Sequence, residues 1–295
     1  MINLNRHEED FGRGLATWYS QADPQKPRII FLGANGHAIS TYPFFINRLA
    51  ERYAIESLEH RAVWPDSGVP QRPYLWEESV SDYAAFLAGR GVQDGELVHV
   101  GHSMGGTIGA LLAVKRPELF KRLVIIEPGT VANRWQGNLL RLMSFERRKE
   151  KVPFIRGTLN RRNTFESREQ FMQSMWTKQT YKGFSEEAMR DYAEGGLIER
   201  DGKFCLKYHP AWEAQNFCDT RCMWAELHKV KVPTLLIRAE HTNLQSKKDF
   251  LKVKKKCARY APNIDFVELP GVSHMAIQDD PDLVCRAVFE WLEGS

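Results

Sequence analysis

The chain has 295 residues, of which 43% are hydrophobic and 26% are charged, and its formal net charge is +4. This composition is typical of a globular protein and excludes a disordered chain or a fibrous repeat. The basic residues are spread over the sequence rather than gathered in one stripe, so we expect no nucleic acid as a partner.

The first residues are polar, and no apolar run is long enough to cross a membrane. We therefore expect no stable membrane insertion and a cytoplasmic location. The five cysteines are an odd number at scattered positions, which favours free thiols over a disulfide framework. Cys218 and Cys222 have no second pair of ligands near them in the sequence, so we expect no metal.

Short apolar runs alternate with helical patterns in the first part of the chain. The runs predict strands, and the apolar spacing between them predicts helices, in the order strand 28–33, strand 53–58, helix 76–87, strand 97–101, helix 104–114 and strand 123–126. Strands that alternate with helices indicate an α/β fold, with a mostly parallel sheet covered by helices on both faces.

The alternation stops and later resumes with strand 233–237, helix 247–260, strand 264–269 and helix 281–292. The interruption has no buried-strand runs and is rich in aromatic residues and methionines. We interpret it as an inserted helical cap. The predicted organisation is a core over residues 1–130, the cap over 131–230, and the second part of the core over 231–295.

The sequence Gly101-His-Ser-Met-Gly105 matches G-x-S-x-G at the point where a buried strand meets a helix. A turn this tight has no room for side chains beside the serine, which explains glycines at Gly101 and Gly105. It exposes the Ser103 hydroxyl and leaves the Met104 amide at the start of the helix, where it can stabilise an oxyanion. Ser103 is therefore the candidate nucleophile.

A serine hydroxyl needs a base to take its proton. His274 follows the last predicted strand and a Pro-Gly turn, and a histidine that comes later in the chain than the serine matches the order used with this kind of elbow. His274 is therefore the candidate base. By contrast, we expect His99 and His102 to be packed structural residues.

With this elbow and histidine, the sequence resembles the capped α/β-hydrolases, a superfamily that includes carboxylesterases, lipases and carbon-carbon bond hydrolases, from about Leu15 to the end of the chain. The resemblance implies an eight-stranded sheet, an oxyanion hole and no cofactor. It also implies that a second oxyanion donor comes from the loop after the first long buried strand, where the amide of His37 is the candidate. Asn35 is instead a candidate to brace this loop through its side chain.

The acid departs from the family pattern. The family usually has an aspartate after the strand at 233–237, where this chain has Thr242 and Asn243, and Glu240 lies one step too early. Glu127, at the end of the preceding strand, is the preferred acid, with Glu240 as the alternative.

The aromatic residues and methionines of the cap suit a small-molecule substrate with an apolar acyl or aromatic part, but a helical cap also needs such residues for its own packing. The segment 141–162 has eight basic residues and two glutamates, which is typical of a solvated helix face and also suits an anionic ligand.

We predict a serine hydrolase that cleaves a carboxylic ester through an acyl-Ser103 intermediate. Carbon-carbon bond hydrolysis on the same residues is one alternative. A ligand-binding receptor with negligible turnover is another, favoured by the missing aspartate. The oligomeric state is left open by the sequence.

Overall fold

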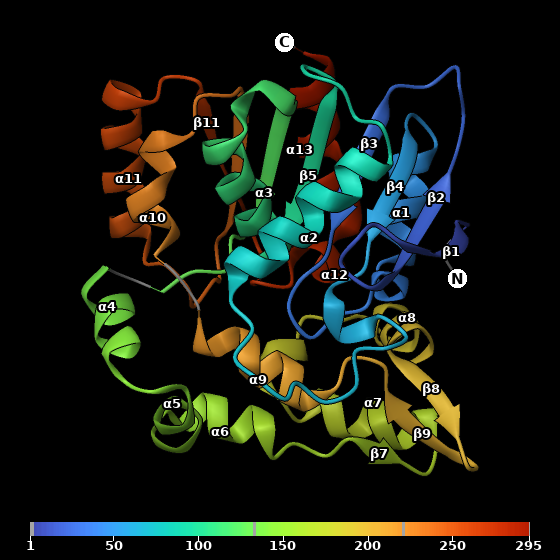
Figure 1. Ribbon diagram of the computed structural model, residues 1–295. Coiled ribbons are helices and arrows are strands. Elements are labelled where there is room, and N and C mark those ends of the chain that lie inside the picture. Colours follow the sequence, from blue (N-terminus) through green and yellow to red (C-terminus); the bar gives the residue numbers. More distant parts are fainter. Residues whose placement is uncertain (1–2, 132–133, 220–221, 295) are drawn as a thin grey trace.

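An eight-stranded sheet forms the centre of the computed structural model, which describes residues 3–131, 134–219 and 222–294 (Figure 1). The strand order is β1-β2-β4-β3-β5-β6-β10-β11. The strands are β1 (Asn5–Asp10), β2 (Leu15–Gln21), β3 (Arg28–Leu32), β4 (Ala54–Leu58), β5 (Leu97–His102), β6 (Phe120–Ile126), β10 (Thr234–Ala239) and β11 (Ile264–Leu269). All neighbours from β4 to β11 are parallel, which confirms the predicted α/β class with a mostly parallel sheet.

The first two strands, β1 and β2, were not expected from the sequence. β1 pairs antiparallel with β2, and β2 pairs antiparallel with β4. β1 reads NRHEED and is almost wholly exposed, because it lies at the edge of the sheet. An edge strand in contact with water needs no apolar run and is commonly charged. A search for apolar runs in the sequence therefore does not find it.

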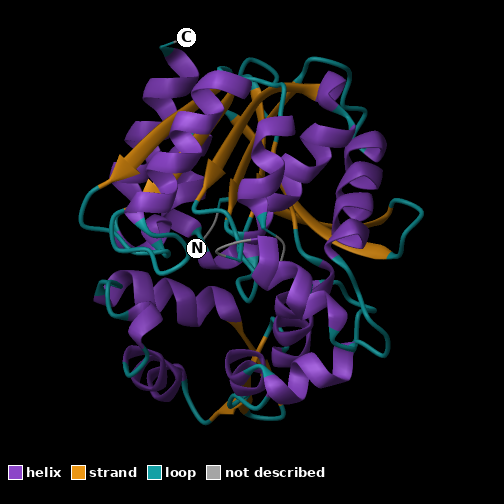
Figure 2. Cartoon of the chain, turned by 90° about the vertical axis from the view of Figure 1, so that its left-hand side faces the viewer, coloured by secondary structure: helices purple, strands orange, loops and turns teal. Residues whose placement is uncertain are grey.

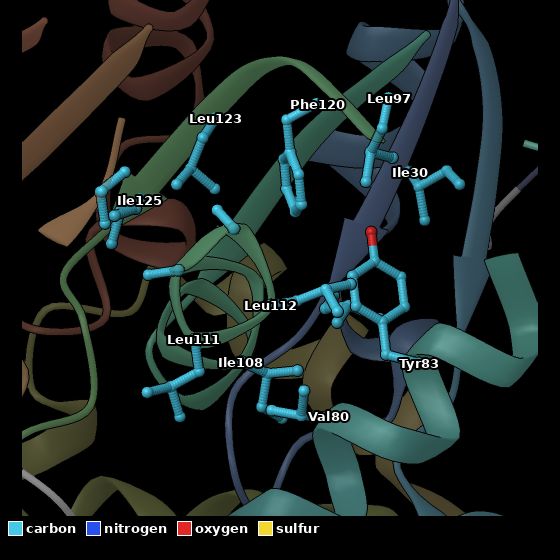
Figure 3. Close-up of a cluster of buried hydrophobic side chains, with 14 of the residues drawn as sticks. Ile30, Val80, Tyr83, Leu97, Ile108, Leu111, Leu112, Phe120, Leu123 and Ile125 are labelled. Carbon is cyan, nitrogen blue, oxygen red and sulfur yellow. The ribbon is translucent and has the colours of Figure 1, made fainter. Parts of the chain in front are cut away.

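Helices cover both faces of the sheet. On one face α2 (Trp76–Gly89), α3 (Met104–Lys115) and α11 (Lys247–Tyr260) contribute to one apolar cluster, and on the other α1 (Pro43–Ala50) and α13 (Pro281–Glu293) contribute to a second. Figure 3 shows Val80 and Tyr83 of α2 beside Ile108 and Leu112 of α3, packed against the strands. The apolar spacing that predicted a helix over 76–87 is the spacing of the buried face of α2. The helix α1 was not predicted from the sequence, and α3 is buried along most of its length.

The chain between β6 and β10 forms an insertion that is mostly helical. Its helices are α4 (Arg134–Leu142), α5 (Phe145–Lys151), α6 (Pro153–Leu159), α7 (Arg168–Trp176), α8 (Glu186–Gly196), α9 (Pro210–Cys218) and α10 (Met223–Glu226). It also contains a small antiparallel sheet, β7 (Thr164–Phe165), β9 (Lys203–Leu206) and β8 (Leu197–Arg200), which the sequence did not predict. These strands have two to four residues, too few to show a period of alternation.

The insertion has an apolar core of its own. Most of this core is made by Phe165, Phe171, Met175, Tyr181, Phe184, Met189 and Tyr192. Many of its aromatic residues and methionines therefore pack against one another. Figure 1 shows most of the insertion below the sheet, whereas α10 lies beside α11 and contributes Met223 to an apolar cluster of the core. Figure 2 shows the same two-part arrangement from the side.

Short elements complete the chain. They are α12 (Ala276–Asp279) and the 3-10 turns Ile39–Thr41, Arg61–Val63, Pro117–Leu119, Gln179–Tyr181 and Leu227–Lys229. Among the residues described, no helix combines the length and the apolar character that crossing a membrane requires.

Candidate active site

Ser103 lies in the turn between β5 and α3. Its backbone has φ 52° and ψ −116°, and its amide donates to the Ile126 carbonyl at 2.9 Å. A Cβ on Gly101 would lie 2.5 Å from the carbonyl carbon of Gly105, and a Cβ on Gly105 would lie 2.3 Å from the Leu32 carbonyl oxygen. The strand and the helix therefore approach too closely for any side chain at these two positions, as the motif predicts.

The sheet register brings the ends of three strands together. His102 at the end of β5 pairs with Ile126 at the end of β6, and Ile126 pairs with Ile237 of β10. Ser103 and Glu127 therefore follow directly after paired residues on neighbouring strands. In parallel α/β sheets, this carboxyl edge is where ligands bind.

His274 lies between Ser103 and Glu127. Its Nε2 is 3.1 Å from the Ser103 hydroxyl, and its Nδ1 is 3.0 Å from Oε2 of Glu127. Glu127 is only 3% exposed, and its Oε1 accepts a hydrogen bond from the Ala239 amide at 2.6 Å. A serine, a histidine and a buried carboxylate thus form one hydrogen-bonded chain, the arrangement that activates a serine hydroxyl.

Glu240 lies apart from this chain of hydrogen bonds. Its side chain is exposed, and its Oε2 accepts from the Gly271 amide at 2.9 Å. The Thr242 hydroxyl accepts from the Leu244 amide at 3.2 Å. The receptor alternative was favoured because the chain has no aspartate after β10 to serve His274. Since Glu127 lies within hydrogen-bond distance of His274, the missing aspartate no longer favours that alternative.

The oxyanion candidates have different environments. Met104 is the first residue of α3, and its amide has no acceptor within the described ranges. The His37 amide donates to the Ala34 carbonyl at 3.3 Å, so it already has an acceptor in a turn. The Asn35 amide has no acceptor among the residues described. The loop that carries it lies against α3, because the Gly105 amide donates to the Gly33 carbonyl at 3.1 Å.

The Asn35 side chain joins this loop to the insertion. Its Nδ2 donates to the Glu213 carbonyl at 3.0 Å, and its Oδ1 accepts from the Tyr208 hydroxyl at 3.0 Å and from Asn216 at 2.9 Å. The bracing role considered for this side chain is therefore present in the structure. It holds the loop through residues of the insertion rather than through residues of the loop itself.

His102 is buried and supports His274, a role that the sequence did not show. Its Nε2 donates to the His274 carbonyl at 2.9 Å, and its Nδ1 accepts from the Tyr42 hydroxyl at 3.0 Å. The same hydroxyl accepts from the Ala34 amide at 2.9 Å. Burial holds the pKa of His102 well below its usual range, so the ring is neutral and can donate and accept at once.

His37 and His99 are buried imidazoles that also stay neutral. Burial lowers the pKa of His37 to about 3, with a further contribution from the charges of Arg161 and His274. Burial likewise lowers the pKa of His99 to about 3, and its ring contacts the Tyr83 hydroxyl and the Gly105 carbonyl. His99 is a packed structural residue, as expected, whereas His37 lines the interior next to the site.

Comparison with known proteins agrees with this fold. A model described as the alpha/beta hydrolase family matches residues 29–287. The chain belongs to the α/β hydrolase family. One relative of this α/β hydrolase is the 2-(acetamidomethylene)succinate hydrolase of Mesorhizobium japonicum, 23% identical over 271 residues that cover 90% of this chain and 87% of the relative. Another is the sn-1-specific diacylglycerol lipase ABHD11 of Mus musculus, 23% identical over 66% of this chain and 58% of the lipase.

Solved structures of other proteins share the architecture of this α/β hydrolase. The crystal structure of E-2-(acetamidomethylene)succinate hydrolase superposes with a TM-score of 0.79 at 19% identity, covering 99% of this chain and all (100%) of that one. A thioesterase domain from the curacin biosynthetic pathway superposes with a TM-score of 0.74 at 17% identity, covering 97% and 99%. At such low identity, this likeness establishes the fold and leaves the reaction to the site.

Proposed function

We propose that this α/β hydrolase cleaves a carboxylic ester through an acyl intermediate on Ser103. The observation that carries the proposal is the hydrogen-bonded chain from Ser103 through His274 to Glu127, with distances of 3.1 and 3.0 Å. A serine in such a chain is a nucleophile at neutral pH, because the histidine takes its proton while the hydroxyl attacks.

In the first half-reaction, the Ser103 hydroxyl oxygen bonds to the acyl carbon and its proton passes to Nε2 of His274. Glu127 stabilises the imidazolium through Nδ1. The tetrahedral oxyanion is held by the amide of Met104 and, in place of His37, by the amide of Asn35. The intermediate collapses, His274 protonates the departing alcohol, and Ser103 keeps the acyl group.

In the second half-reaction, water attacks the acyl carbon while His274 takes one of its protons. The bond to Ser103 breaks, His274 returns the proton to the serine oxygen, and the carboxylic acid leaves. Neither half-reaction needs a cofactor or a metal. One relative supports ester cleavage in general terms, because its name is that of a diacylglycerol lipase.

The test is labelling of the purified protein with a fluorophosphonate probe, combined with a screen of 4-nitrophenyl esters of increasing acyl length. We expect the wild type to be labelled and to turn over at least one ester. The Ser103→Ala variant should lose both properties and keep its thermal unfolding temperature.

The outcomes separate the alternatives. Labelling of Ser103 without turnover of any ester would favour carbon-carbon bond hydrolysis by the same residues. Absence of labelling in the wild type would favour a ligand receptor and overturn the proposal. Labelling that persists in Ser103→Ala would show that the reactive residue is not Ser103, and it would overturn the proposal as well.

A further inference from the structure

Arg161 lies in the insertion between α6 and β7, and it differs from the other basic residues of its segment. Its side chain is only 13% exposed, whereas the neighbouring Arg162 is exposed. Its Nη1 is 2.6 Å from Oε2 of Glu213 on α9. Its Nε and Nη2 are buried and have no hydrogen-bond partner among the residues that the structure describes.

The two unpartnered atoms form one edge of the guanidinium. The Nε and Nη2 hydrogens point the same way, as the two prongs of the fork that binds both oxygens of a carboxylate. Buried N–H donors of a charged group are costly to leave without an acceptor. Glu213 contacts the remaining nitrogen, and the Tyr181 hydroxyl also interacts with the guanidinium. The edge formed by Nε and Nη2 has no acceptor in well-formed hydrogen-bond geometry among the described residues.

The ion pair lies directly on the loop that follows β3. A Cβ on Gly36 would lie 2.8 Å from the carboxyl carbon of Glu213, and the Glu213 carbonyl accepts from Asn35 at 3.0 Å. The His37 imidazole, on the same loop, is within electrostatic reach of both Arg161 and His274. Arg161 and His274 therefore both lie near the His37 ring.

Positive charge exceeds negative charge around this pair. Lys178 is half-buried, and its pKa is lowered mainly by burial and also by the nearby charge of Arg161. The two cations Arg161 and Lys178 face the single carboxylate of Glu213. A buried site with surplus positive charge and free donors is stabilised by a bound anion.

We propose that Arg161 binds a carboxylate of the substrate through Nε and Nη2, so that the molecule hydrolysed at Ser103 is an anionic ester. This inference rests on the proposed function and adds a substrate class to it. Arg161 is a binding residue in this scheme, and the bond that breaks is still the acyl bond at Ser103.

The test compares two 4-nitrophenyl esters of equal acyl length, the monoester of adipic acid, which ends in a carboxylate, and the uncharged hexanoate. We expect wild type to prefer the adipate ester by about tenfold or more in kcat/KM, as charged hydrogen bonds allow. Arg161→Gln should lose about 10- to 100-fold of kcat/KM on the adipate ester, mainly through KM, and less than about threefold on hexanoate.

Two further variants make the test specific. Arg162→Gln is the matched control, because its guanidinium bonds on the surface to the Thr164 carbonyl and to Gln170, and it should change neither ester. Glu213→Gln removes the competing carboxylate and should lower KM for the adipate ester. A purely structural ion pair would instead make Arg161→Gln and Glu213→Gln lose activity alike on both esters.

A second measurement does not depend on turnover. Adipate, but not uncharged 1,6-hexanediol, should slow fluorophosphonate labelling of Ser103 in wild type, and this protection should vanish in Arg161→Gln. Equal use of both esters by wild type, equal losses on both esters in Arg161→Gln, or no protection by adipate would overturn the proposal. If the proposed function itself fails, the wild-type protein is not labelled even when no anion is added, and this result is distinct from the three outcomes above.

Discussion

Glu127 holds two hydrogen bonds that assign its two carboxylate oxygens to different tasks. Oε1 accepts from the backbone amide of Ala239, and Oε2 faces Nδ1 of His274. The first bond fixes the orientation of the carboxylate. The second requires a proton on Nδ1, which leaves Nε2 free to accept the proton of Ser103.

We expect Glu127→Gln to reduce kcat on the order of 10³- to 10⁴-fold. The Ala239 amide keeps the glutamine oxygen at Oε1, so the NH2 group faces Nδ1 and drives the proton of His274 to the wrong nitrogen. The measurement is the steady-state rate on the best 4-nitrophenyl ester. Glu240→Gln is the control, and its kcat should stay near the wild-type value, because the Glu240 carboxylate accepts a hydrogen bond from the Gly271 amide and lies apart from His274. The reverse ranking would make Glu240 the acid.

Glu59 gives the stability a predictable pH dependence. It is buried directly after β4, and its oxygens accept from the Ile39 amide at 3.0 and 3.1 Å. Burial raises the pKa of Glu59 from 4.5 to about 8, although the Ile39 bond and the charge of Lys207 oppose the shift. Because the folded pKa is the higher one, the stabilisation is complete below pH 4.5 and is lost as the pH rises through about 8.

We expect Glu59→Gln to remove this contribution, because glutamine stays neutral and can still accept from Ile39. The free energy of unfolding, measured by urea denaturation from pH 4.5 to 8, should fall with pH more steeply in wild type than in the variant. A difference between the two proteins that is constant with pH would contradict the assignment of a raised pKa.

At the level of elements, the site depends on the contact between β3 and α3. The closest approach is at Gly105, where a Cβ would meet the backbone of β3 rather than a movable side chain. We expect Gly105→Ala to destabilise the fold by about 2 kcal/mol or more, since the helix or the strand must shift. The readout is the urea midpoint.

A glycine in another helix serves as the control. Gly157 in α6 has nothing within 4 Å of the Cβ position. Gly157→Ala should be neutral or stabilise by about 0.5 to 1 kcal/mol, because alanine restricts the unfolded chain. Equal losses at Gly105 and Gly157 would show that steric contact at the elbow is not the cause.

For the whole molecule, the decisive contact is the one between the insertion and the core. A Cβ on Gly195 of α8 would lie 2.0 Å from the Ser40 carbonyl oxygen, and the Ser40 hydroxyl donates to the Gly195 carbonyl at 2.7 Å. The segment after β3 therefore carries the loop of Asn35 and His37 and also the surface on which α8 rests. We expect a movement of the insertion to be transmitted to the loop that carries Asn35 and His37.

We expect Gly195→Ala to lower kcat/KM and to increase hydrogen exchange over residues 186–206, while exchange in β5 and β6 stays unchanged. The adjacent Gly196→Ala is the matched control, because its Cβ would make only ordinary contacts, 3.4 Å from the Tyr192 ring at the nearest. Equal exchange in the two variants would mean that α8 does not depend on this close approach.

The sequence by itself determined the parallel core and pointed to Ser103 and His274 as the candidate nucleophile and base. Buried strands of a parallel sheet are apolar along their length, and the glycine pattern around Ser103 reports a steric limit within a few residues of chain. His274 could be found because it follows the last strand and its turn. These signals are local, so one sequence contains them. The edge strand β1 and the small sheet of the insertion lack them, because their residues alternate too briefly or face water.

Only the tertiary structure decided which groups meet. The carboxylate beside His274 depends on the register of β6 against β10, which pairs residues far apart in the chain, and a shift of that register would move Glu127 away from the histidine. The buried guanidinium of Arg161 has the same origin, because its partner Glu213 lies far along the chain, on α9. Composition alone cannot distinguish a buried arginine in a basic segment from its exposed neighbours.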